Sequence, residues 1–228
     1  MSNLETVHTT LPLVLAVDTS SASAGFALAR GETVLAKLKS DSSVPHSRAF
    51  FLQTTELLNS AGVSLSDVQL LAAATGPGSF TGLRVGLAAL KGLAHALGKP
   101  LLGVNSFDAV ALSAKMTGEL AVLIEAGRRE LYFGFRRVTE TGWIETIGED
   151  LVGLPEMLLK AIPVGQMVTG DVSEAIFTSR PDLHFQPVQS MPAEEIALYA
   201  PKLLASSALA SLRPHYVRAS DAEIKRKA

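Results

Sequence analysis

The sequence has no cysteine, and this absence narrows its chemistry before any motif is considered. A chain without thiols has no disulfide and no thiolate metal site. Residues 1–10 are polar and lack the charged-then-apolar order of a signal peptide, which together with the missing cysteines favours the cytoplasm. No apolar run reaches the roughly 18 residues that a membrane-spanning helix needs, so we expect no membrane contact.

Charged residues are scarce as well, at 18% of the chain, with a formal net charge of −2 at pH 7. Proteins that hold nucleic acid need clustered Lys and Arg for the phosphates. The basic groups at Arg128-Arg129, Arg136-Arg137 and Lys225-Arg226-Lys227 read as solvated faces rather than a binding stripe. We therefore do not expect the chain to hold nucleic acid by itself. What is abundant is hydrophobic residues, 47% of 228, enough for a sizeable core.

Histidine occurs five times, at positions 8, 46, 95, 184 and 215. No two histidines lie four residues apart, the spacing that places a metal-binding pair on one face of a helix. Neither a metal pair nor a nucleophile with a placed base is identifiable, so we predict no catalytic and no metal-binding residue. A metalloprotease-like protein is accordingly the least favoured interpretation.

The most informative stretch is the glycine-rich loop of residues 76–86, which follows an apolar run at 70–74 and opens an apolar segment ending near Leu97. This order predicts a strand, a tight loop and a helix. Pro77 and Gly78 predict a type II turn, and Ser79 or Thr81 is expected to cap the helix. The loop fits no common phosphate motif, because a P-loop needs Lys and a hydroxyl residue directly after its last glycine, and a dinucleotide fingerprint needs glycine at position 81.

A turn that only shapes the helix is therefore favoured over a phosphate cradle, although a helix N-terminus after a strand is a place where anions bind. The weak candidates for cofactor binding are Asp18, Thr19, Ser20, Gly76, Gly78 and Ser79. In that interpretation Asp18, at the end of the first strand, anchors a metal ion beside the phosphates. The alternative is that Asp18 caps its own turn.

The order of elements is repeated along the chain. Strands are expected at 11–17, 25–28, 33–38, 70–74 and 101–104, with helices at 46–61, 83–97 and 106–115, the last begun by a Ser106 cap. Strands at 120–124, 131–138, 143–146 and 167–169, with helices at 155–161 and 193–207, follow the same order. The repetition predicts two similar α/β lobes, residues 11–116 and a smaller 117–228, after a polar extension at 1–10.

The helix after the glycine loop is apolar nearly all round, so both of its sides must be covered. One side can be a sheet. The other is either the chain's own second lobe or a partner protein, with Gly82 and Gly86 allowing close approach of backbones. The sequence leaves both possibilities open.

Several motifs together resemble one known family. They are Leu15-Ala16-Val17-Asp18-Thr19-Ser20, His46-Ser47, Gly76-Pro77-Gly78-Ser79-Phe80-Thr81-Gly82-Leu83-Arg84-Val85-Gly86, and Pro214-His215-Tyr216-Val217-Arg218 with Asp221-Ala222-Glu223. They are similar to the motifs of the TsaB (YeaZ) family. The chain departs from that family at Glu125-Ala126-Gly127-Arg128, where Asp-Ala-Arg is usual.

The resemblance implies an actin-like fold of the duplicated, ribonuclease H-like kind, with two lobes of mixed sheet and flanking helices. It implies a non-catalytic subunit that pairs with a TsaD-like transferase and a TsaE-like ATPase to make threonylcarbamoyladenosine beside the tRNA anticodon. ATP and metal are then expected in the partners and no cofactor in this chain, tRNA is contacted only through the complex, and the chain alone forms a homodimer. The resemblance also implies a partner interface on the first-lobe helices, at His46, Phe50, Gln53, Leu57, Leu83, Leu87, Leu90, Lys91 and Ala94.

The competing hypothesis is an actin-like enzyme that binds, or weakly hydrolyses, ATP in the cleft between the lobes. Asp18 would anchor magnesium and the loop at Gly76 would contact phosphate. Against this hypothesis, Asp18-Thr19-Ser20-Ser21 lacks the glycine usual in kinase-like phosphate loops, and Gly170-Asp171 only partly matches the glycine pair that would admit an adenine ring. No general base is identifiable for such an enzyme.

Overall fold

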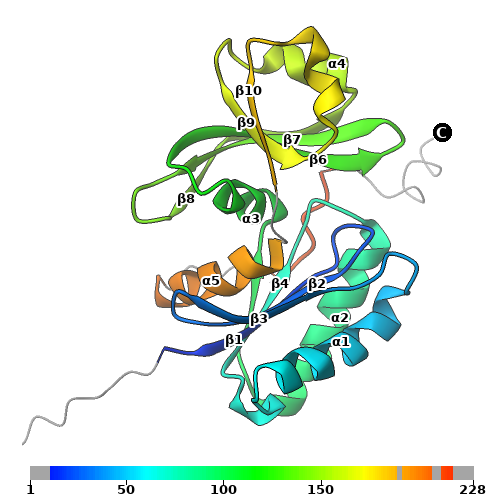
Figure 1. The fold of residues 1–228 in the computed structure, drawn as a ribbon, viewed down its shortest axis with the longest axis vertical. Helices are drawn as coiled ribbons and strands as arrows, with labels where there is room; N and C mark the ends of the chain where they lie inside the picture. Colours follow the sequence, from blue (N-terminus) through cyan, green and yellow to red (C-terminus); the bar gives the residue numbers. More distant parts are fainter. Residues whose placement is uncertain (1–10, 189–191, 207–211, 218–228) are drawn as a thin grey trace, which may run out of the picture.

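Two sheets of five strands each divide the molecule into two lobes, seen one above the other in the computed structural model (Figure 1). The structure describes residues 11–188, 192–206 and 212–217. The first sheet contains β1 (Leu13–Asp18), β2 (Gly25–Arg30), β3 (Thr33–Lys39), β4 (Leu70–Ala74) and β5 (Leu101–Val104), and the second contains β6 (Gly118–Gly127), β7 (Glu130–Val138), β8 (Ile144–Gly153), β9 (Met167–Asp171) and β10 (His184–Pro187). The expected extension at 1–10 lies outside the described residues.

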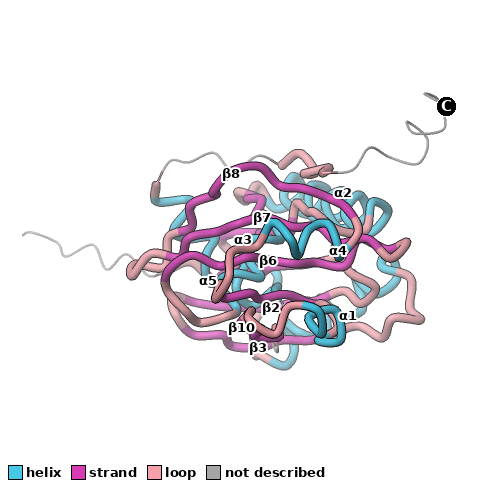
Figure 2. The backbone as a smooth tube through the Cα atoms, turned by 90° about the horizontal axis from the view of Figure 1, so that it is seen from above, coloured by secondary structure: helices cyan, strands magenta, loops and turns pink. Residues whose placement is uncertain are grey.

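Helices cover both faces of each sheet. The helices are α1 (His46–Ser60), α2 (Phe80–Leu97), α3 (Ser106–Ser113), α4 (Pro155–Leu158) and α5 (Pro192–Ala205), and three short 3₁₀ turns lie at Leu65–Asp67, Leu159–Ala161 and Glu174–Ser179. Seen from above, the strands of both sheets are aligned roughly along the same axis of the molecule (Figure 2). None of the helices in the described ranges is long and apolar enough to cross a membrane.

The two sheets have the same topology. The strand order is β3-β2-β1-β4-β5 in the first sheet and, read in the same sense, β8-β7-β6-β9-β10 in the second. In each sheet the first three strands of the lobe pair antiparallel, the fourth pairs parallel to the first, and the fifth pairs parallel to the fourth. The expectation of two similar α/β lobes is confirmed, because a shared strand order is what a duplicated unit produces.

The lobes exchange one helix each. Helix α3 follows the last strand of the first sheet but packs on β6 and β7, whereas α5 follows the second sheet but packs on β1 and β2 (Figure 1). The assignment of all residues from 117 to 228 to the second lobe is therefore wrong for α5. The second sheet begins with β6 at Gly118.

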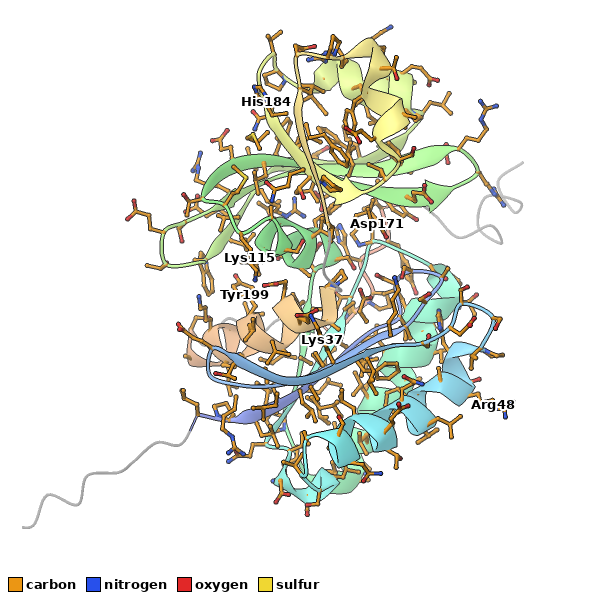
Figure 3. The ribbon with its side chains drawn as sticks, viewed as in Figure 1. Lys37, Arg48, Lys115, Asp171, His184 and Tyr199 are labelled. Atoms are coloured by element: carbon orange, nitrogen blue, oxygen red, sulfur yellow. The ribbon has the colours of Figure 1, made fainter. Side chains whose placement is uncertain are left out.

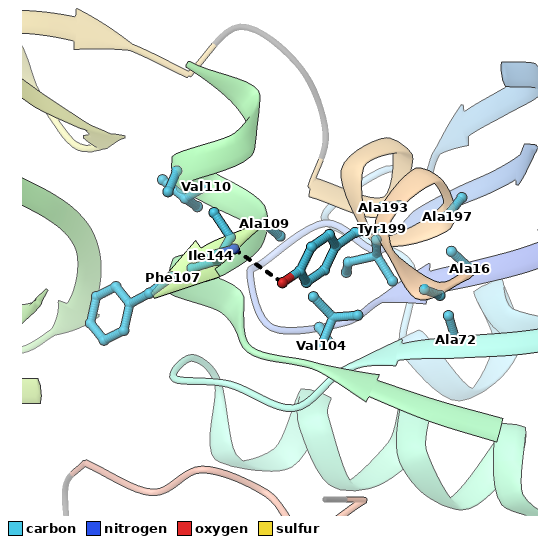
Figure 4. Close-up of a cluster of buried hydrophobic side chains, with 14 of the residues drawn as sticks. Ala16, Ala72, Val104, Phe107, Ala109, Val110, Ile144, Ala193, Ala197 and Tyr199 are labelled. Atoms are coloured by element: carbon cyan, nitrogen blue, oxygen red, sulfur yellow. Dashed lines mark hydrogen bonds between the residues drawn. The ribbon is translucent and has the colours of Figure 1, made fainter. Parts of the chain in front are cut away.

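The exchanged helices build a central core between the lobes. Strand β1 turns Val14 and Ala16 toward it, while Leu13, Leu15 and Val17 face α1 and α2 on the other side of the sheet. Figure 4 shows α5, α3 and the first sheet meeting in the central core, where the Tyr199 hydroxyl accepts a hydrogen bond from the backbone N–H of Ile144 at 3.3 Å. Burial raises the pKa of Tyr199 to about 12.

Several local expectations are wrong. The Gly76–Pro77 peptide is cis and the positive φ, +102°, falls on Gly76 rather than on Gly78, so the turn is not type II. Asn105, not Ser106, caps α3, its side chain accepting from Phe107 N–H at 2.8 Å. Strand β10 was not expected from the sequence, since its four residues, His-Phe-Gln-Pro, show no clear alternation.

Candidate functional site

A cleft of about 970 Å³ opens between the lobes beside the glycine-rich loop. The first lobe contributes the turn after β1 and the first turn of α2, including Ser20, Ser79 and Arg84. The second lobe contributes, among others, Glu125 and Asp171, and Figure 3 places Asp171 on the edge of the second lobe that faces the first. The walls therefore carry both acidic and basic groups, with no strong excess of either sign.

The β1–β2 turn is packed directly on the start of α2. The backbone N–H of Ser79 donates to the carbonyl oxygen of Ser20 at 2.6 Å, and the hydroxyl of Thr19 donates to the carbonyl oxygen of Gly82 at 2.8 Å. The Ser79 hydroxyl accepts from Gly82 N–H at 3.2 Å, which confirms Ser79 as the cap of α2. The N–H groups of Ser79 and Gly82 and the carbonyl oxygen of Gly82 are thus all satisfied by the chain itself.

Glycine is required where these backbones meet. A Cβ added at Gly78 would lie 2.4 Å from the carbonyl oxygen of Ser20, and one at Gly82 would lie 2.0 Å from that of Thr19. One at Gly86 would lie 2.2 Å from the Thr19 hydroxyl. The glycines of the loop motif therefore permit packing within the chain, and of the two possibilities left open for Gly82 and Gly86, these contacts are with the chain's own Thr19.

Asp18 lies beneath this contact rather than in the cleft. Its carboxylate accepts a hydrogen bond from Ser20 N–H at 2.8 Å, closing its own turn, and only 4% of the residue is exposed. Burial, the largest influence, raises the pKa of Asp18 despite that hydrogen bond. The six weak cofactor candidates are brought together as expected, but Asp18, Thr19 and Gly76 are buried, and only Ser20, Gly78 and Ser79 line the cleft.

A buried arginine lies behind the cleft. Arg136 is 0% exposed; its Nε donates to Asp108 Oδ1 at 2.7 Å, and its two terminal nitrogens donate to Asp150 at 2.8 and 3.0 Å. Burial raises the pKa of Asp108, whereas hydrogen bonds from His215 and Arg136 outweigh burial and lower that of Asp150. The interpretation of Arg136-Arg137 as a solvated face is therefore wrong for Arg136. The nearby acidic residues that hold it are far apart in sequence, so no local pattern identified it.

The expected partner interface is divided by the structure. Five of its residues are buried in the chain's own core: Phe50, Leu57, Leu87 and Leu90 between the helix pair and the first sheet, and Leu83 in the central core between the lobes. For these five the expectation of contact with a partner is wrong, because their side chains are already covered. Of the other four, Lys91 is exposed and His46, Gln53 and Ala94 are half-buried.

Two side chains of α1 that the predicted interface did not include, one aromatic and one aliphatic, point outward. Phe51 and Leu52 of α1 are 68% and 56% exposed. A helical wheel of α1 alone could have separated them from Phe50, since neighbouring residues are about 100° apart on a helix. On α2, Ala88, Lys91 and Gly92 are exposed in the same way.

Within residues 11–188, 192–206 and 212–217, no three His, Cys, Asp or Glu side chains come together in a way that could hold a metal ion. His46 uses its Nε2 to donate to the carbonyl oxygen of Ser21 at 3.0 Å. The residues present in this part of the chain therefore do not fit a histidine-bound metal.

Comparison with known proteins gives consistent matches. Residues 40–207 match the family model described as TsaD, tRNA N6-adenosine threonylcarbamoyltransferase. The chain is 31% identical over 138 residues to the tRNA threonylcarbamoyladenosine biosynthesis protein TsaB of Bacillus subtilis, and the match spans 60% of each chain, which is less than two thirds.

Solved structures extend the likeness to most of the chain. YeaZ from Pseudomonas aeruginosa superposes with a TM-score of 0.75 and 26% identity, over 90% of this chain and 100% of that one. Component A of the Acidaminococcus fermentans (R)-2-hydroxyglutaryl-CoA dehydratase superposes with a TM-score of 0.57 and 11% identity, over 85% and 99%, which shows the shared fold alone. The prediction of an actin-like, two-lobed fold is confirmed.

Proposed function

This chain belongs to the TsaD family of tRNA N6-adenosine threonylcarbamoyltransferases, and from that membership we propose that it acts in the synthesis of threonylcarbamoyladenosine in tRNA. Its similarity to TsaB and YeaZ supports a place in that process as a subunit that assists a TsaD-like transferase, rather than as the transferase. The TsaE-like ATPase is the second partner in this proposal. The near-neutral charge supports tRNA being held by the complex rather than by this chain alone.

One observation carries the non-catalytic role. The carbonyl oxygen of Ser20 accepts the N–H of Ser79 at 2.6 Å, at the helix terminus where a phosphate would otherwise be bound. The Asp18 carboxylate is buried and accepts from Ser20 N–H at 2.8 Å, so it too is satisfied within the turn. An arrangement of this kind favours a turn locked for structural reasons over one that cradles a nucleotide.

The outward face of α1 and α2 is the proposed pairing surface. It presents Phe51 and Leu52 from α1 and Ala88, Lys91 and Gly92 from α2. Exposed large apolar side chains beside small residues allow a partner helix to approach closely and bury apolar area. A second copy of the chain would use the same surface, so homodimer and heterodimer would compete.

The experiment is a reconstitution with the TsaD-like and TsaE-like proteins of the same cells. The double substitution Phe51→Glu and Leu52→Glu is expected to leave a folded monomer that neither self-associates nor co-elutes with the transferase, and to abolish its stimulation of threonylcarbamoyl transfer. Leu151→Glu is the matched control, because Leu151 is an exposed leucine of the second lobe. Normal co-elution of the double variant would remove the α1–α2 face from the proposal, and transfer at full rate without this chain would remove the assisting role.

A second candidate function is nucleotide binding in the cleft. It is favoured by Lys39 and Arg84, two cationic residues of the first lobe that line the cleft. Calorimetric titration with magnesium-ATP separates the two candidates: micromolar binding with turnover supports an enzyme, and no heat of binding supports the assisting subunit.

A further inference from the structure

Residues 212–217, called here the closing segment, run between the two lobes. His215 and Tyr216 line the large cleft, and Arg213, Pro214 and His215 line a second cavity of about 430 Å³ on the other side. His215 thus belongs to the wall of both cavities. The closing segment separates them and touches each lobe.

On the first lobe the closing segment is attached to the glycine-rich loop. The backbone N–H of His215 donates to the carbonyl oxygen of Thr75 at 2.7 Å, next to β4. The carbonyl oxygen of His215 lies 2.9 Å from the position of a Cβ at Gly76, whose φ of +102° also favours glycine. A side chain at position 76 would therefore push the closing segment away.

Tyr216 attaches the same segment to the first turn of α2. Its ring lies against Phe80, with 5.0 Å between ring centroids, and its hydroxyl accepts a hydrogen bond from Arg84 Nε at 3.1 Å. The Arg84 guanidinium lies 3.7 Å from the centroid of the Phe80 ring. Contacts of a cation with aromatic faces stabilise such a cluster even near the surface.

On the second lobe the attachment is made by the His215 ring. Its Nε2 donates to Asp150 Oδ2 at 3.0 Å, and Asp150 is held in turn by Arg136. The absence of a side chain at Gly134 leaves space for the Asp150 carboxylate, because a Cβ at position 134 would lie 2.3 Å from Asp150 Oδ1. The Asp150 side chain is therefore largely buried, at 9% exposed, and held by Arg136, whereas the His215 side chain that contacts it is 42% exposed.

Two adjacent residues, His215 and Tyr216, thus connect β8 of the second lobe with α2 of the first. Neighbouring Cα atoms are only about 3.8 Å apart, so a movement of one attachment is passed to the other. We propose that the closing segment is a strap between the lobes, fixed to the second lobe by His215 and to α2 by Tyr216, so that the cleft opens and the first turn of α2 loosens together. This goes beyond the proposed function and holds whichever partner the chain has.

The first test measures the separation of the lobes. Because the chain has no cysteine, spin labels can be placed only at Glu56→Cys on α1 and Lys160→Cys on the second lobe, both exposed positions. His215→Ala is expected to lengthen and broaden the distance distribution between the two labels. His184→Ala, an exposed histidine on the second lobe away from the segment, is expected to match the unsubstituted chain. If His215→Ala does not fold, His215→Leu serves instead, because leucine fills a similar space and has no donor for Asp150.

The second test reads the coupling from the opposite end. Tyr216→Phe keeps the ring on Phe80 and removes only the hydroxyl that Arg84 contacts, so the fold is expected to be retained. The loss of one such hydrogen bond is expected to speed amide exchange about tenfold at the start of α2 and also in β8 around Asp150. Amides of β4 should exchange as before, since β4 is paired on both sides, with β1 and β5.

An unchanged label distance in the position-215 variant that folds would overturn the proposal. Faster exchange in Tyr216→Phe that is confined to residues 212–217 would overturn it as well, because the segment would then be attached to the lobes without connecting them.

Discussion

Thr19 and Gly82 are in direct contact: the Thr19 hydroxyl donates to Gly82 O at 2.8 Å, and the Thr19 carbonyl oxygen lies 2.0 Å from where a Cβ at Gly82 would stand. The contact joins the end of β1 to the first turn of α2. The Thr19 carbonyl belongs to the backbone and a Cβ is fixed to it, so neither could rotate away from the other. Only glycine at position 82 therefore allows α2 to pack this closely against the turn after β1.

Gly82→Ala is therefore expected to destabilise the protein by about 1–3 kcal/mol, since overpacking of a rigid contact forces the backbone to shift. Gly92→Ala on the same helix is the control: nothing lies within 4 Å of its Cβ position, and alanine should stabilise α2 by about 1 kcal/mol. Urea unfolding of both variants measures the difference. Equal stability of the two variants would contradict the packing role of Gly82.

Asp18→Asn is expected to leave the fold intact and stability unchanged or increased at pH 7. The asparagine oxygen can still accept from Ser20 N–H, while the buried charge is removed. Asp18→Ala loses that hydrogen bond and should cost about 1–2 kcal/mol. In reconstituted threonylcarbamoyl transfer, Asp18→Asn should be as active as the unsubstituted chain; loss of activity with normal stability would indicate a functional carboxylate.

The same residue gives a pH dependence of known sign. The pKa of Asp18 is raised in the folded state, so the unsubstituted chain loses stability as pH rises from the unfolded pKa, about 3.9, through the folded value. Asparagine does not ionise, so the Asp18→Asn variant does not lose stability from this group in this pH range. Its stability relative to the unsubstituted chain should therefore increase with pH across that window and then level off, as measured by urea unfolding at several pH values. A constant difference would contradict the raised pKa.

Arg136→Met is expected to destabilise the protein strongly, by about 3–5 kcal/mol, because it leaves Asp108 and Asp150 in a buried site without their partner. Arg137→Met is the adjacent control. Arg137 is paired with Glu119 and Glu145 on the surface, where an ion pair contributes about 0–1 kcal/mol. Thermal unfolding of the two variants should differ clearly.

Leu87→Glu should prevent folding rather than block pairing, since Leu87 is 3% exposed and a buried unpaired carboxylate costs several kcal/mol. Lys91→Glu, one turn further along α2 and exposed, should fold normally. Circular dichroism and size-exclusion chromatography distinguish the two. A folded, monomeric Leu87→Glu would show that the side chain can reach the surface.

The sequence predicted the fold because its main signals are local. Short apolar runs at 11–17 and 70–74, a serine cap before α2 and the repeated order of elements are local or regular signals. Most strands and helices lie near the predicted ranges, but β8 continues to Gly153 rather than ending at 146, and β10 was not predicted. The helix exchange could not be predicted in this way. Both α3 and α5 are apolar, and which sheet each one covers depends on contacts between residues far apart in the chain.

The candidate site was predicted less well. The sequence indicated that Asp18, Ser20 and Ser79 come together, but it could not show that they satisfy one another and leave little open to a ligand. Apolar composition on α1 and α2 identified the helix pair without distinguishing Phe50, which is buried, from Phe51, which is exposed. Arg136 had no local sign of burial, because Asp108 and Asp150 come from other elements.

The exchange of α3 and α5 has a consequence for how the protein is made. All five strands of the first sheet precede residue 105, yet the helix that covers their inner face, α5, begins at Pro192. During synthesis the apolar inner face of the first sheet, with Val14, Ala16 and Ala72, therefore waits for nearly the whole chain to emerge. A nascent chain in this state exposes apolar surface that favours aggregation, so the first lobe should depend on chaperones until the last helix arrives.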